Sequence, residues 1–380
     1  MSPIYLDNNA TTALDPRVFA EMEPLFSGFP YNASSTHSFG QRAKGLLIQS
    51  TQIVADCMAV SPQEIIFTSG ATESLNMVIQ GIARARVKGH ILTCNLEHVS
   101  VLQPLQFLEK QGFEVSYLFP REGEGALSLE DVEKNTQPDT FLIVLMGANN
   151  ETGILTDIEA IAAFAEERKI GFVVDGVALT GKEECRIPRG VSAFCMSGHK
   201  IHGPLGVGCA LVRKHVKLQP FILGGPQQLG RRGGTENLPG IVGFAKAIAL
   251  MQEELTDSVN KMRALRDLFE ERLTSLLPDS FIIGQKNRRV CNTSMVVFPH
   301  IEGEVLLMRL DLQKVAASHG SACSSGALEP SRVLLGMGFS RQIANSALRF
   351  SLSKWTTGQE IDRAVITIQQ EVETLASLMS

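Results

Sequence analysis

Short runs of β-branched and other apolar residues alternate with amphipathic stretches over the first half of the chain. The runs have the length and composition of buried strands, and stretches such as 74–86 and 157–168 have helical periodicity. Strands that alternate with helices predict right-handed crossovers and an α/β fold with a mostly parallel central sheet flanked by helices. The predicted strands are 64–68, 90–93, 140–146, 171–175 and 193–197.

The pattern changes in the last third of the chain. A long helical stretch, 240–277, precedes a second group of strands at 294–298 and 314–317. This change predicts a second, smaller α+β unit, and 380 residues are enough for two or three domains. We expect a large domain over residues 13–254 and a small domain made of 1–12 and 255–380, although pattern alone leaves the place of the first dozen residues open.

Composition excludes several classes of protein. With 44% hydrophobic and 20% charged residues the chain resembles an ordinary globular protein, and a net charge of -5 gives no global basic field for nucleic acid. The start of the chain has no secretory-signal pattern. The longest apolar run, 141–146, is far shorter than the ~20 residues of a membrane span. We expect a soluble cytoplasmic protein with neither a nucleic-acid nor a membrane partner.

Seven cysteines and eight histidines show no CxxC or HExxH spacing, so we expect neither a disulfide framework nor a metal. Most cysteines lie in apolar runs, where cysteine packs as a small core residue. Cys323 differs, because the segment 318–326 consists mostly of small residues that bury little apolar area. An exposed thiol there is a hazard unless it reacts, so Cys323 is a candidate nucleophile, with core packing as the alternative.

Polar residues follow the predicted strands, and ligands of parallel sheets bind beyond the carboxyl ends of the strands. The small-residue turn 69–72 suits an anion at a helix start, and His98, Asn150, Asp175 and Lys200 follow the next four strands. Each has an ordinary structural explanation by itself, such as a cap, a turn or a solvated surface residue. Together they meet the needs of pyridoxal phosphate: phosphate donors, an acid for the ring nitrogen and an amine for the aldehyde.

The chain resembles the cysteine desulfurase family, the NifS/IscS-like class V branch of the fold-type I enzymes that depend on pyridoxal phosphate. The similarity extends from 5–12 to 349–352, nearly the whole length. The motifs that carry it are 67–74 (FTSGATES), 149–153 (NNETG), 197–204 (SGHKIHGP), 234–237 (GTEN) and 320–323 (GSAC).

The resemblance implies roles for the residues at the strand ends. Lys200 would bind the aldehyde of the cofactor, His98 would stack on the ring and move protons, and Asp175 would pair with the pyridine nitrogen. Asn150 would hydrogen-bond near the phenolic oxygen. The phosphate would be held by Ala71, Thr72, Ser197 and His199, and by Thr235 of the neighbouring subunit, so the resemblance implies a homodimer.

The implied reaction converts L-cysteine to L-alanine and leaves a persulfide on Cys323, the nucleophile. Arg349, with Asn32 nearby, would clamp the substrate carboxylate, for which a guanidinium fork is geometrically suited. The sulfur would pass to an acceptor protein, either an iron–sulfur scaffold or a tRNA-thiolation relay.

One departure from the family pattern falls at the expected site. Ala178 stands where the family has a glutamine that hydrogen-bonds the phenolic oxygen, and we expect Gly176 and Ala178 to leave space beneath the ring for a water molecule. Three alternatives stay open. Two are other reactions on the same fold, a selenocysteine lyase and another class V aminotransferase-like activity, and the third, because of this departure, is a weakly active regulatory homologue.

Overall fold

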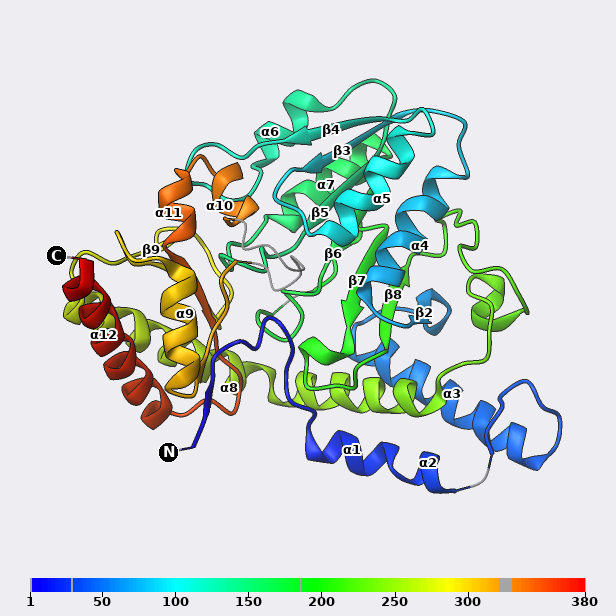
Figure 1. The fold of residues 1–380 in the computed structure, drawn as a ribbon. Helices are drawn as coiled ribbons and strands as arrows, with labels where there is room; N and C mark the ends of the chain where they lie inside the picture. The colour runs from blue at the N-terminus through cyan, green and yellow to red at the C-terminus, as the bar shows by residue number, and fades with distance from the viewer. Residues whose placement is uncertain (1, 29, 185, 321–329, 380) are drawn as a thin grey trace.

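A seven-stranded sheet forms the centre of the protein in the computed structural model, which describes residues 2–28, 30–184, 186–320 and 330–379 (Figure 1). The strand order is β2-β8-β7-β6-β5-β3-β4, and the strands run parallel except for β8, which is antiparallel to β2 and β7. The strands are β2 (Ile65–Thr68), β3 (His90–Cys94), β4 (Glu114–Leu118), β5 (Thr140–Met146), β6 (Gly171–Asp175), β7 (Ala193–Ser197) and β8 (Gly208–Val212).

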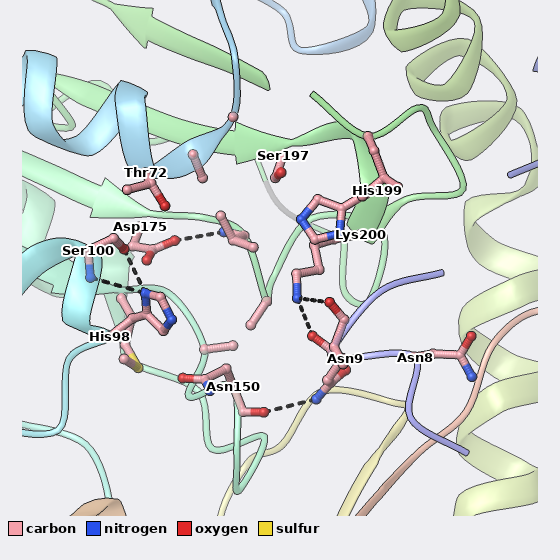
Figure 2. A pocket seen from close by; sticks show the side chains of 18 of the residues that line it. Asn8, Asn9, Thr72, His98, Ser100, Asn150, Asp175, Ser197, His199 and Lys200 are labelled. Carbon is pink, nitrogen blue, oxygen red and sulfur yellow. Dashed lines mark hydrogen bonds between the residues drawn. The ribbon is translucent and has the colours of Figure 1, made fainter. Parts of the chain in front are cut away.

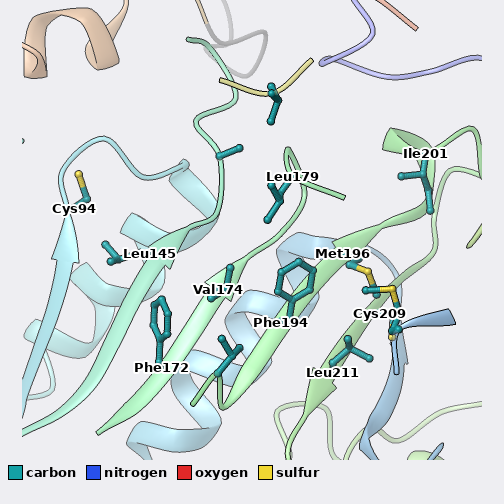
Figure 3. Packing of buried hydrophobic residues seen from close by; sticks show 14 of the residues in the cluster. Cys94, Leu145, Phe172, Val174, Leu179, Phe194, Met196, Ile201, Cys209 and Leu211 are labelled. Carbon is teal, nitrogen blue, oxygen red and sulfur yellow. The ribbon is translucent and has the colours of Figure 1, made fainter. Parts of the chain in front are cut away.

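Helices cover both faces of this sheet because its strands are apolar on both sides. Val173 packs into the core beneath α4 and α5, whereas its neighbours Phe172 and Val174 pack into the opposite core (Figure 3). Successive residues of a strand point to opposite faces, so such runs need two helical layers. The helices of this part are α1 (Pro16–Met22), α2 (Pro24–Ser27), α3 (Ser38–Cys57), α4 (Ala71–Ala83), α5 (Val99–Glu109), α6 (Leu129–Asn135), α7 (Ile158–Arg168) and α8 (Leu238–Leu276), with short 3-10 helices η1 (Pro62–Glu64), η2 (Gly198–Lys200) and η3 (Gln227–Gly230).

A smaller unit with its own apolar core follows in the C-terminal part of the chain. Its antiparallel sheet has the order β12-β10-β9, and a separate parallel pair joins β1 to β11. Phe269 of α8 and Phe350 of β12 lie at the centre of this core. The elements are β1 (Ile4–Tyr5), β9 (Phe281–Ile282), β10 (Thr293–Val297), α9 (Gly303–Leu312), β11 (Val315–Ala316), α10 (Arg332–Gly336), α11 (Arg341–Asn345), β12 (Ala347–Ser351) and α12 (Gly358–Met379).

The predicted fold class is confirmed, and all five predicted strands of the large sheet are present within a residue at their ends. The strands β4 and β8 were not predicted as strands; β8 completes the sheet as an antiparallel member. The start of the chain packs with the smaller unit, because β1 pairs with β11 and Leu6 is buried in the same core. The division at residues 254 and 255 stays a prediction, and it falls inside the continuous helix α8.

Across the described ranges, no helix is long and apolar enough to span a bilayer.

The core of the smaller unit predicts a stability effect. Phe269 is fully buried, with its ring 5.1 Å from that of Phe350. We expect Phe269→Ala to lower the free energy of unfolding by about 3–5 kcal/mol, because it removes apolar contacts and leaves a cavity. Phe119→Ala is the control, since Phe119 is 65% exposed and its loss should change stability by less than about 0.5 kcal/mol. Urea unfolding followed by circular dichroism measures both, and equal midpoints for the two variants would contradict the assignment of this core.

Candidate active site

A cavity of about 390 Å³ opens at the carboxyl edge of the large sheet (Figure 2). Parallel strands end at the same edge, so the residues that follow β3, β5, β6 and β7 converge there. The cavity is lined by nine of the residues singled out in the sequence: Ala71, Thr72, His98, Asn150, Asp175, Ser197, His199, Lys200 and Arg349.

One end of the cavity is suited to an anion. Helix α4 begins at Ala71, and Gly70 before it provides no side-chain cap, so the first backbone N–H groups of the helix have no partner within the helix. Ser197 and Thr72 add hydroxyl groups to the same lining. The carboxylate of Glu73 is held by Arg232, with Oε1 2.8 Å from Nε. Uncompensated N–H groups and hydroxyls at a helix start form a phosphate site.

Asp175 places a carboxylate in the interior of the cavity. It is the last residue of β6 and is 6% exposed, and its Oδ1 accepts a hydrogen bond from the backbone N–H of Val177 at 3.0 Å. Burial raises the pKa of Asp175 to about 6, although Val177 and the nearby Lys200 oppose this shift. The carboxylate therefore lacks a full counter-charge, which a protonated ring nitrogen would supply.

Lys200 lies at the end of η2, directly after β7. Its Nζ donates hydrogen bonds to two backbone carbonyls near the start of the chain, those of Asn9 and, at 2.6 Å, of Ala10. The side chains of Asn8 and Asn9 border the same space (Figure 2). The N-terminal segment therefore closes the cavity on the side of the amine.

Two histidines flank Lys200, and both favour the neutral form. His98 caps α5 and its Nδ1 lies 2.7 Å from Oγ of Ser100, while burial and the charges of Lys200 and Arg332 lower its pKa. Burial and Lys200 lower the pKa of His199 to about 4. A neutral imidazole at His98 is able to accept a proton inside the cavity.

Arg349 is almost completely buried in β12, at 2% exposure. Its Nη2 donates to Oδ1 of Asp7 at 2.8 Å, and its Nη1 donates to the backbone carbonyl of Asn150 at 3.0 Å. Its Nε is buried without a hydrogen-bond partner. A donor left in that condition costs free energy unless a ligand supplies the acceptor.

Two of the predicted residues do not line this cavity, and a third is not described. Thr235 and Asn32 are exposed in the single chain, and neither lines the cavity. Asn32 Oδ1 accepts a hydrogen bond from the N–H of Ser34, 2.9 Å away. Cys323 lies outside the described residues. The roles of these three residues stay predictions.

Residues that sequence reasoning did not single out also take part. Lys182 is buried beside Lys200, and its Nζ donates to the carbonyl of Lys200 at 3.1 Å. Burial lowers the pKa of Lys182. Asp7 and Asn9 lie in the motif 5–12, but only the folded chain brings that motif to the strand ends. A lysine after a glycine in a turn carries no sequence signal for burial.

The surroundings of Ala178, the departure from the family pattern, differ in part from our expectation. Ala178 does line the cavity. The expectation that Gly176 leaves space beneath the ring is wrong, because a Cβ at Gly176 would lie 2.1 Å from Cζ of Phe194 in the core. Phe194 is 1% exposed and fills that volume, so of these two residues only Ala178 lines the cavity.

The shifted pKa of Asp175 predicts a pH-dependent stability. A buried acid whose pKa is raised loses stability as pH rises from its ordinary value to about 6, and the cost is complete above that pH. We expect Asp175→Asn, freed of any cofactor, to be more stable than the parent protein by about 1–3 kcal/mol at pH 8 and equal to it near pH 4.

Thermal unfolding across this pH range, on protein stripped of cofactor, measures the difference. The exposed Asp257→Asn controls for the loss of a carboxylate. With pyridoxal phosphate bound the order should reverse, because Asp175→Asn would lose the predicted pair with the ring nitrogen. A gap between the two proteins that does not depend on pH would contradict this account.

The donor set fits pyridoxal phosphate. The uncapped start of α4 suits the phosphate, Asp175 suits the ring nitrogen, and Lys200 offers an amine to the aldehyde. No group of three histidine, cysteine or acidic side chains within the described ranges is arranged to hold a metal ion.

Comparison with known proteins agrees with this site. The chain matches the family described as aminotransferase class-V over residues 4–364. It is 40% identical over 380 residues to a cysteine desulfurase of Trichormus azollae, covering 100% of this chain and 95% of the relative. It is 38% identical over 378 residues to cysteine desulfurase IscS of Dictyoglomus turgidum, covering 99% and 96%.

Among solved structures, a NifS-like protein superposes with a TM-score of 0.91 at 35% identity, covering 98% of this chain and all of the other. Members of this family depend on pyridoxal phosphate, the cofactor that the cavity fits. The match in sequence and the match in architecture both extend over nearly the whole chain, so the protein belongs to the class V aminotransferase family and, within it, to the cysteine desulfurases.

Proposed function

We propose that the protein is a cysteine desulfurase that uses pyridoxal phosphate to convert L-cysteine to L-alanine, with transfer of the sulfur to Cys323. The observation that carries the proposal is the convergence of Lys200, His98, Asp175 and Arg349 on one cavity. Identity of 40% to a cysteine desulfurase over the full chain supports the same reaction.

Different residues of the cavity would contact different parts of the cofactor. The start of α4 with Ala71 and Thr72, together with Ser197 and His199, would hold the phosphate, Asp175 the ring nitrogen and Lys200 the aldehyde. Asn150 and His98 would contact the phenolic oxygen and the ring face. The bound cofactor supplies an electron sink for the electron pair left on the substrate carbon.

Arg349 is the proposed carboxylate site for L-cysteine. The Nε of Arg349 has no acceptor, and the guanidinium plane is fixed by Asp7 and by the carbonyl of Asn150. Because these contacts are made before substrate arrives, the carboxylate binds to a fork whose orientation is already set. The Asp7 carboxylate also offsets the buried positive charge.

Two bases of the cavity would move protons. Lys200 Nζ takes the proton from Cα of the substrate, and the backbone carbonyls of Asn9 and Ala10 hold the resulting ammonium. His98, neutral because of its lowered pKa, passes protons to and from the substrate sulfur.

The transfer of sulfur needs no external oxidant. The thiolate of Cys323 attacks the substrate sulfur, an S–S bond forms, and the bond between that sulfur and the substrate Cβ breaks. The electron pair stays with the carbon fragment, which is protonated and leaves as L-alanine. An acceptor protein, an iron–sulfur scaffold or a tRNA-thiolation relay, then takes the sulfur in the cytoplasm.

A homodimer is part of the proposal. Large apolar side chains are exposed on α1, α2, α3 and the segments on either side of β8, and a second copy of the chain would bury them. The cavity itself reaches this surface at Leu205 and Gly206, and Thr235 lies exposed on the segment before α8. The exposed apolar residues are Phe19, Phe26, Phe39, Ile48, Leu205, Leu223 and Leu229.

The alternatives left open by the sequence are not favoured. The relatives compared above bear the name cysteine desulfurase, and the lysine, aspartate and histidine of the site are all placed at the cavity in spite of Ala178.

Variants of Lys200 and Cys323 should lose different steps of the proposed reaction. We expect Lys200→Ala to lose the visible absorption band of the bound cofactor together with all alanine formation. Cys323→Ser should retain the band and its change on addition of L-cysteine, but release no sulfide. Absorption spectra, alanine assays and mass spectrometry of the protein for an added sulfur test both variants. Full turnover by Cys323→Ser would refute the proposed nucleophile.

The dimer proposal predicts the result of charging its apolar surface. Leu223 and Leu229 are 81% and 71% exposed, so Leu223→Asp with Leu229→Asp should leave each chain folded but prevent association. We expect a monomer with weakened cofactor affinity, because Thr235 of the neighbouring subunit would no longer reach the phosphate. Sedimentation velocity measures the state. Leu312→Asp, at an equally exposed position on α9, is the control that should stay dimeric.

A further inference from the structure

Two residues that flank the segment containing Cys323, Gly320 and Ser331, lie close together. A Cβ built on Gly320 would lie 3.5 Å from Cβ of Ser331, so residues on either side of the segment that contains Cys323 are in contact. The ends of that segment are therefore fixed by whatever holds Gly320 and Ser331.

Glu151 lies at this point and is buried, at 3% exposure. Its Oε2 accepts a hydrogen bond from Oγ of Ser331 at 2.5 Å, and the same oxygen lies 3.8 Å from the Cβ position of Gly320. Ser331 Oγ in turn accepts from the N–H of Leu334 at 3.1 Å and so caps α10. A carboxyl group buried this deeply is costly unless it is hydrogen-bonded, and Ser331 supplies the side-chain hydrogen bond.

The residue before Glu151 connects this point to the cavity. Asn150 lines the cavity, and its backbone carbonyl accepts from Nη1 of Arg349 at 3.0 Å. Arg349 also exchanges two backbone hydrogen bonds with Ser318, at 2.7 and 3.1 Å, just before Gly320. The pair Asn150–Glu151 therefore contacts Arg349 on one side and Ser331 on the other.

Glu151 itself does not line the cavity, so it is not placed to touch cofactor or substrate. Its neighbours are nevertheless the proposed carboxylate site and both ends of the segment that contains the proposed nucleophile. This arrangement is more than a helix cap requires, since Ser331 would cap α10 without Glu151.

We propose that Glu151 is a positioning residue that, through its hydrogen bond with Ser331, sets where the Cys323 segment starts and ends relative to the cavity. This inference rests on the proposed desulfurase function and deepens it. It assigns to Glu151 an effect on the transfer of sulfur to Cys323, and none on the binding of cofactor or L-cysteine. Small displacements between reacting groups have large effects on rate.

The test compares two serines that cap short helices in the same part of the chain. Ser331→Ala removes the cap of α10 and the hydrogen bond to Glu151. Ser340→Ala removes the cap of α11, where the exposed Ser340 accepts from the N–H of Ile343 at 3.3 Å, and leaves Glu151 unchanged. Both variants lose a comparable helix cap. Only the first loses the proposed positioning contact.

Glu151 is varied in two ways. Glu151→Gln keeps an oxygen that accepts from Ser331, whereas Glu151→Ala has none. If Glu151→Ala does not fold, two other measurements still test the inference. One compares Ser331→Ala with Ser340→Ala, and the other uses the double variant Glu151→Gln with Ser331→Ala. The double variant should form the persulfide at the same rate as Ser331→Ala alone.

All variants are measured as purified holoenzyme in two steps. The absorption change of the cofactor on addition of L-cysteine reports binding, and acid-quenched single turnovers analysed by mass spectrometry report sulfur on Cys323. We expect Ser331→Ala and Glu151→Ala to form the persulfide at least about tenfold more slowly, with an unchanged absorption response. Ser340→Ala and Glu151→Gln should behave as the parent protein.

Equal persulfide rates for Ser331→Ala and Ser340→Ala would overturn the inference. A loss in the absorption response of Ser331→Ala as large as its loss in persulfide rate would also overturn it. Failure of the proposed function has a different signature. The parent protein itself would then show no response to L-cysteine or no sulfur on Cys323.

Discussion

The buried guanidinium of Arg349 joins three parts of the chain that are distant in sequence. It belongs to β12 of the smaller unit, pairs with Asp7 near the N-terminus and donates to the carbonyl of Asn150 beyond β5. Removing one partner of a buried ion pair is costly because the other charge is left uncompensated. The positions of the N-terminal segment, the β5 loop and the small sheet therefore depend on one another. All three contribute residues to the lining of the cavity.

The same burial explains the electrostatic character of the cavity. Desolvation raises the pKa of Asp175 and lowers those of His98, His199 and Lys182, so each group is pushed toward its neutral form. Burial of these ionisable groups costs free energy when no partner of opposite charge is present. A ligand that carries a phosphate and a protonated ring nitrogen lowers this cost. Binding of the cofactor and stability of the large sheet are thus coupled through the ends of its strands.

Gly176 and Ala178 lie close together in sequence but have different surroundings in the fold. Gly176 is required by the ring of Phe194, which occupies the place that a Cβ at 176 would need. Ala178, two residues later, lines the cavity with a methyl group where the family has a glutamine. Gly176 is therefore a matter of core packing, and only Ala178 changes the chemistry that the cavity offers.

The apolar runs and their spacing were sufficient to predict the parallel sheet, because strands apolar on both faces require helices on both sides. They also placed His98, Asn150, Asp175 and Lys200 together, since parallel strands end at one edge. The contacts of Asp7, Asn9, Lys182 and Glu151 depended instead on how distant segments dock against that edge. Local periodicity determines which face of an element is buried. The hydrogen-bond partner of a buried polar group often comes from a segment that is distant in sequence, so it is determined only by the tertiary structure.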